Sequence, residues 1–153
     1  MKKYTCLITT ILLIISMLPI CCLAKSIPAS TTEIIYLDDG SYITIELTQT
    51  ENRASGTKTG SKAYTHYSNS GSQNWRAVLR GTFSYTGSSA TCTAAACDVT
   101  ITDTDWYIVT KTATKSGNSA IGELTMGQKF LGITIDKESV SMQLSCDANG
   151  NLS

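Results

Sequence analysis

Residues 75–85 read WRAVLRGTFSY, and they show the clearest inside/outside alternation in the chain. The odd-numbered positions carry the large apolar side chains and are Trp75, Ala77, Leu79, Gly81, Phe83 and Tyr85. The even-numbered positions are Arg76, Val78, Arg80, Thr82 and Ser84. Because successive side chains of a strand point to opposite faces, this stretch predicts a strand with one buried face. Trp75 shares its stripe with Leu79 and Phe83, so we expect it in the core.

Strand-like segments separated by turn residues flank this stretch on both sides. The further predicted strands cover residues 34–37, 42–48, 63–67, 90–102, 106–114, 119–126 and 139–146. Gly40 and Gly117 fall between strands, where turns that require a positive φ are expected. Many short strands without helical periodicity predict an all-β, antiparallel β-sandwich, Ig-like or related, with about seven to eight strands after an N-terminal signal helix.

The apolar phase changes within residues 90–102. One parity holds Cys92, Ala94 and Ala96, and the other holds Cys97, Val99 and Ile101. A β-bulge near residues 94–96 would explain the change, because one extra residue reverses the facing of all that follow.

Residues 1–24 resemble a secretory signal peptide. Lys2 and Lys3 form a basic start, residues 7–20 are mostly apolar, and Cys22 and Ala24 are small residues at the expected cleavage positions. We expect a secreted, extracellular protein without a membrane span after cleavage. An uncleaved membrane anchor is the less favoured alternative. A lipid on Cys21 is disfavoured because a lipobox needs a small residue in place of the isoleucine before it.

Residues 25–61 are predicted to form an N-terminal arm with a possible β-hairpin. Residues 50–61 (TENRASGTKTGS) contain no large apolar side chain and resemble a linker. The β-sandwich domain is expected over residues 62–153, as a monomer.

The charge balance argues against a nucleic-acid partner. The chain has 153 residues, with 12 Lys and Arg against 12 Asp and Glu, so its formal net charge is zero. A nucleic-acid-binding domain needs a basic surface.

Three cysteines follow the signal segment. Residues 92 and 97 are about 16 Å apart in an extended strand, too far for a disulfide. Cys146 is therefore expected to pair with either Cys92 or Cys97. Three cysteines without a clustered histidine do not form a zinc pattern, and neither a metal nor a cofactor is predicted.

The run SKAYTHYSNSGSQNWRAVLRGTFSYTGSSATCT carries a K-x-Y-T-x-Y opening and a G-T-F-x-Y-x-G-S-S-A motif, and the chain ends in LSCDANGNLS. Over residues 58–153 it is similar to a group of small uncharacterised secreted β-proteins of anaerobic Gram-positive (clostridial) bacteria. The resemblance implies a secreted β-domain with a Cys92–Cys146 disulfide, and it supplies no catalytic residues. The shared strand phase of Cys146 with Val140, Met142 and Leu144 fits that pairing.

Catalytic constellations are not favoured, and no catalytic residue is predicted. His66 is the only histidine, it has no accompanying nucleophile motif, and it is expected on an exposed or edge strand. Asp103 and Asp105 are expected to stabilise a turn, because glycosidase carboxylates come from separate parts of a cleft. Asp147 begins a polar C-terminal turn that lacks the spacing of a calcium loop.

Tyr64, Tyr67 and Tyr107 are the candidates for a binding surface, since aromatic rings on a sheet can stack on sugars. The favoured hypothesis is a non-catalytic extracellular or envelope-associated binding module for a surface ligand. The alternatives are a small glycan-acting hydrolase with two convergent carboxylates, and a secreted inhibitor or effector with an exposed apolar loop around residues 129–131.

We expect the exported protein to begin at Lys25, because signal peptidase cleaves after a small residue such as Ala24. N-terminal sequencing of secreted protein checks this. A start at Met1, or a lipid on Cys21, would contradict it.

Overall fold

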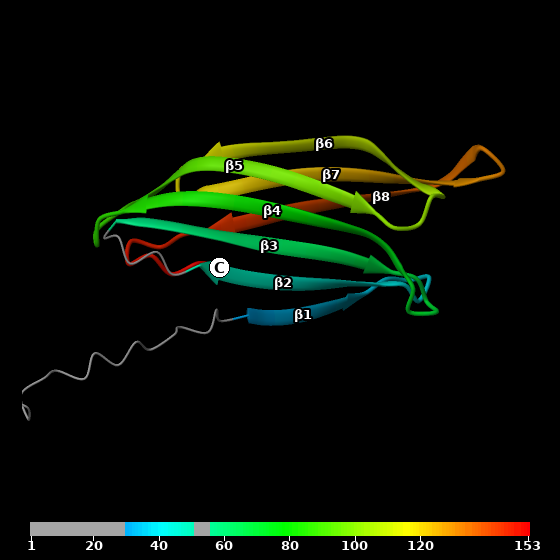
Figure 1. The fold of residues 1–153 in the computed structure, drawn as a ribbon, viewed down its shortest axis with the longest axis horizontal. Coiled ribbons are helices and arrows are strands. Elements are labelled where there is room, and N and C mark those ends of the chain that lie inside the picture. The colour runs from blue at the N-terminus through cyan, green and yellow to red at the C-terminus, as the bar shows by residue number, and fades with distance from the viewer. Residues whose placement is uncertain (1–29, 51–55) are drawn as a thin grey trace, which may run out of the picture.

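The computed structural model describes residues 30–50 and 56–153 (Figure 1). It confirms the predicted all-β class, with eight antiparallel strands in the described part. The strands are β1 (Ser30–Tyr36), β2 (Tyr42–Thr50), β3 (Thr57–Tyr67), β4 (Gln73–Tyr85), β5 (Ala90–Ile101), β6 (Trp106–Ser116), β7 (Ser119–Phe130) and β8 (Ile133–Ser145). No helix in these ranges is long and apolar enough to cross a membrane. The signal segment lies outside the described residues.

The strands form two layers that follow the order of the chain. One sheet has five strands in the order β1-β2-β3-β4-β5, and the other has three in the order β6-β7-β8. Within each sheet, every strand pairs with the next strand along the sequence. Figure 1 shows β6, β7 and β8 lying over the side of the five-stranded sheet formed by β3, β4 and β5.

The core lies between the two layers, as the alternation in β4 predicts. Trp75, Leu79 and Phe83 have no exposed side-chain surface. They meet the second sheet through its own alternating positions, which are Leu124, Met126, Val140, Met142 and Leu144. Each such side chain contributes about 1.5–3 kcal/mol on burial, so this stripe is the main source of stability.

The β1–β2 hairpin, which the sequence places in an N-terminal arm, belongs to the five-stranded sheet. β2 pairs with β3 along its whole length, from Tyr42↔Tyr67 to Thr50↔Thr59. Ile43 and Ile45 join the common core. The second half of the expected linker is the start of β3, since strands on both sides supply its backbone hydrogen bonds without any need for large apolar side chains.

A bulge in β5 resolves the change of phase between the two cysteines. Thr82 pairs with Ala94 and Phe83 pairs with Cys92, which leaves Thr93 without a partner on β4. The bulge therefore lies just before the expected place, and Ala94 is exposed rather than inward-facing. The extra residue lets both Cys92 and Cys97 face the core.

Gly40 and Gly117 have φ values of +82° and +56°, which confirms the turns expected at both positions. Alanine at Gly117 should destabilise the fold by about 1 kcal/mol, because an L-residue resists this backbone conformation while open space leaves no side-chain clash. Thermal unfolding checks this, with Ser116→Ala as the matched control. Equal melting temperatures for both variants would contradict it.

Candidate functional site

The β7–β8 hairpin extends beyond the rest of the sandwich, as Figure 1 shows. β6 begins at the pair Trp106↔Gln128, and β7 and β8 continue past it as two strands alone. We call residues 129–135 the apolar ribbon. The large apolar side chains of the ribbon are strongly exposed, and they are Phe130 (62% exposed), Leu131 (87%), Ile133 (70%) and Ile135 (58%). Among the other large apolar side chains of the described residues, only Tyr36 is as exposed as these.

The turn at the tip of the ribbon is occupied by Leu131 and Gly132. Their φ values are +50° and +80°, the combination of a type I′ hairpin turn. Such turns favour Asn-Gly, because a leucine in the left-handed region costs roughly 1 kcal/mol. Leu131 is thus both conformationally strained and almost fully exposed, so nothing within the fold explains it.

The root of the ribbon is held in place by Tyr107 and the β5–β6 turn. The Tyr107 hydroxyl lies 2.7 Å from the Thr134 hydroxyl, and the Lys129 ammonium lies 4.5 Å from the centre of the Tyr107 ring. The Lys129 amide donates a 2.8 Å hydrogen bond to the Asp105 carbonyl. The sandwich therefore orients the ribbon before any partner binds.

The three predicted binding tyrosines do not gather on one surface. Tyr64 is only 7% exposed, and burial raises its pKa. Tyr67 points to the other face of β3 and stacks on Tyr42, with ring centres 4.9 Å apart. Tyr107 packs at the root of the ribbon. Of the three, only Tyr107 contacts the apolar ribbon.

His66 is buried between two tryptophans, contrary to the expected exposed or edge position, because β3 is a central strand of its sheet. Its ring stacks on Trp75 at 5.2 Å and leans against Trp106 at 5.0 Å. The indole N–H groups of both tryptophans have no hydrogen-bond partner among the described residues, a cost of about 1–3 kcal/mol each. These three rings are therefore held together by aromatic packing and not by hydrogen bonds of the indole groups.

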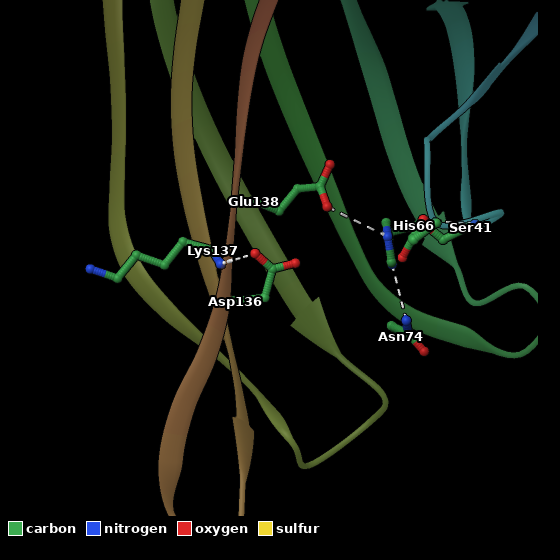
Figure 2. A network of polar contacts seen from close by, with 7 residues as sticks. Ser41, His66, Asn74, Asp136, Lys137 and Glu138 are labelled. Carbon is green, nitrogen blue, oxygen red and sulfur yellow. Dashed lines mark hydrogen bonds and ion pairs between the residues drawn. The ribbon is translucent and has the colours of Figure 1, made fainter.

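The His66 ring points between two polar side chains (Figure 2). The Asn74 amide nitrogen lies 3.0 Å from Nδ1, so Nδ1 accepts and the neutral ring carries its proton on Nε2. Nε2 faces the Glu138 carboxylate of β8 at 3.8 Å. Burial lowers the pKa of His66, and burial also raises the pKa of Glu138, with Asp136 and Asp39 adding to the rise. Both shifts oppose the charged pair, so the contact is not a salt bridge at neutral pH.

The polar groups near His66 do not form a nucleophilic triad. The Ser41 hydroxyl donates a 2.6 Å hydrogen bond to Asp39, and His66 is held by Asn74 and faces Glu138 instead. A triad needs the hydroxyl on one ring nitrogen and a carboxylate on the other. This arrangement holds a neutral ring in place and activates no hydroxyl.

The other carboxylates singled out in the sequence serve turns. The Asp103 carboxylate accepts the Asp105 amide at 3.0 Å, and the Asp147 carboxylate accepts the amides of Asn149 and Asn151. Across residues 30–50 and 56–153, no group of histidine, cysteine or acidic side chains is arranged to hold a metal ion.

The predicted Cys92–Cys146 disulfide is absent, and all three cysteines are buried free thiols. The β6–β7 turn lies between the two residues, with Gly117 accepting the amide of Cys92 and Asn118 that of Cys146. The Cys92 thiol donates a hydrogen bond to the Ala94 carbonyl, and the Cys146 thiol donates one to the Asp147 carbonyl. Burial raises the pKa of all three thiols, which disfavours the reactive thiolate.

Surface hollows also lie elsewhere on the described part of the molecule, and two of them exceed roughly 300 Å³. One of about 390 Å³ is lined by Thr32, Glu33, Ile45, Leu47, Lys62, Leu152 and Ser153. The other, of about 550 Å³, is lined by Gly56, Tyr85, Thr86, Gly87 and Asn149. The first holds one side-chain carboxylate, Glu33, and the second holds none, so neither has the facing pair that glycoside hydrolysis requires.

No family model, curated protein or solved structure matches the chain. The similarity to clostridial secreted proteins therefore stays an expectation.

Lowering the pH should destabilise the protein through His66. Its pKa lies below the ordinary 6.5 in the folded state, so the unfolded chain binds a proton first as the pH falls. The free energy of unfolding therefore falls as the pH drops from about 6.5 to the pKa of His66 in the folded protein. The slope is at most about 1.4 kcal/mol per pH unit. The raised pKa of Glu138 acts in the opposite direction.

A comparison of His66→Phe with the wild type isolates this effect, since the variant keeps an aromatic ring and lacks the titration. Thermal unfolding at about pH 7.5 and about pH 5, on either side of the ordinary histidine pKa of about 6.5, should show a steeper loss of stability for the wild type. Parallel profiles would contradict the assignment.

Proposed function

We propose that this chain is an exported, non-catalytic binding module that docks on its target through the apolar ribbon. The observation that carries the proposal is the exposure of Phe130, Leu131 and Ile133, between 62% and 87%, on a hairpin that projects from the sandwich. Soluble monomers rarely expose contiguous apolar patches without an interaction to make. Export is supported by the signal-like residues 1–24.

The ribbon offers apolar surface whose burial would favour binding. Burial of one large apolar side chain contributes about 1.5–3 kcal/mol, so four of them supply roughly 6–12 kcal/mol before the cost of association. The hairpin is already held by Tyr107 and the Asp105 carbonyl, so little ordering entropy is lost on docking.

Among the alternatives, the ribbon favours the secreted inhibitor or effector over the hydrolase. An exposed apolar loop around residues 129–131 is the feature expected of an inhibitor, and Phe130 and Leu131 fit it. An inhibitor would be the special case in which the target is an enzyme. The hydrolase is disfavoured because Asp103 and Asp105 share one turn.

The double variant Phe130→Ser/Ile133→Ser should abolish target capture while leaving the melting temperature nearly unchanged, since both side chains lie outside the core. The measurement is the quantity of protein that the immobilised chain captures from cell-wall and mucin preparations. Ile34→Ser is the matched control, because Ile34 is an apolar side chain on β1 that is 51% exposed. Equal capture by wild type and double variant would contradict the proposal.

A further inference from the structure

The end of the sandwich that carries the ribbon is strongly acidic. Figure 1 shows the β1–β2 turn, the β5–β6 turn and the projecting hairpin at the same end. We call the carboxylates there the acidic collar, which consists of Asp38, Asp39, Asp103, Asp105, Asp136 and Glu138. The cations in the same segments are Lys129 and Lys137. Six carboxylates thus outnumber two ammonium groups in these segments.

Three members of the collar, which are Asp39, Asp136 and Glu138, are close enough to influence one another. After burial itself, the charges of Asp136 and Asp39 raise the pKa of Glu138, although Asp39 comes from the other sheet. Lys129 lies over the Tyr107 ring, so its charge is placed against an aromatic face. The segments around the root of the ribbon therefore carry a net negative formal charge.

We propose that the target of the ribbon is a protein surface with an apolar recess and a rim of basic side chains. This inference rests on the proposed function. A convex tip formed by Phe130, Leu131 and Ile133 needs a recess to bury all its sides. Basic groups at the rim would meet the collar, which speeds association and excludes partners of the wrong charge.

The collar also distinguishes this partner from a lipid bilayer. Three residues per strand give the ribbon a length of about 10 Å, close to the Debye length at physiological salt. When the tip enters a surface, the collar is therefore about one screening length away and is repelled by anionic headgroups. An apolar tip that served as a membrane anchor would need a basic surround instead.

Defined probes test this inference. The full chain without its signal segment is titrated with two synthetic amphipathic peptides of the same leucine pattern, one carrying lysine and one carrying glutamate. It is also titrated with vesicles of phosphatidylcholine, with and without phosphatidylglycerol. The lysine peptide should bind at least about tenfold more tightly than either alternative, with an affinity that falls as salt rises.

Two variants separate the contributions of charge and of apolar contact. Asp38→Asn/Asp105→Asn/Asp136→Asn should weaken binding of the lysine peptide by about tenfold at low salt. The matched control is Glu33→Gln/Asp98→Asn/Glu123→Gln, which removes the same charge from exposed positions outside the collar and should have little effect.

Preferential binding to anionic vesicles or to the glutamate peptide, or binding to none of the probes, would overturn the partner chemistry. Each of these results leaves the docking role of the ribbon intact as long as Phe130→Ser/Ile133→Ser still abolishes capture. Undiminished binding of the lysine peptide by that variant would instead show that the ribbon is not the docking element.

Discussion

The stack of His66 between Trp75 and Trp106 connects the two layers at the end of the sandwich from which the ribbon projects. His66 and Trp75 belong to the five-stranded sheet, and Trp106 begins the first strand of the other sheet. Aromatic pairs of this kind contribute about 0.5–1.5 kcal/mol beyond the burial of their surface. Because Trp106 also pairs with Gln128, the stack fixes the last point at which the hairpin is supported by a third strand.

The molecule therefore divides into a scaffold and a projection. Up to Gln128 the side chains of β7 alternate between core and solvent, and Leu124 and Met126 are fully buried. Beyond it the apolar residues have no facing sheet, yet Tyr107 and the Asp105 carbonyl still hold the hairpin. A rigid scaffold that presents a small preformed apolar tip suits recognition, because little conformational entropy is lost on binding.

The sequence was most informative where one face of a strand is buried. The alternation in residues 75–85 correctly predicted that Trp75, Leu79 and Phe83 form the core. It failed where pairing rather than side chains determines structure. Residues 57–61 form a strand because β4 pairs with all of them and β2 pairs with residues 59–61, and no local pattern records those neighbours.

The candidate site was only partly predictable for the same reason. Residues 129–131 were singled out as an apolar loop, but Ile133 and Ile135 were not, because the sequence does not reveal where β6 stops covering the hairpin. The burial of His66 depends on β3 having a neighbour on each side and on Trp106 arriving from the other sheet. The disulfide was inferred from strand phase and resemblance, and the turn between Cys92 and Cys146 belongs to tertiary structure alone.

The central claim is that the tip of the ribbon serves recognition and not folding. The melting temperature of Leu131→Asn tests it most directly, because asparagine tolerates the positive φ of +50° while removing the exposed apolar side chain. We expect an unchanged melting temperature, or one higher by up to a few degrees because about 1 kcal/mol of backbone strain is relieved. A clearly lower melting temperature would contradict it, since it would mean that Leu131 packs as part of the fold.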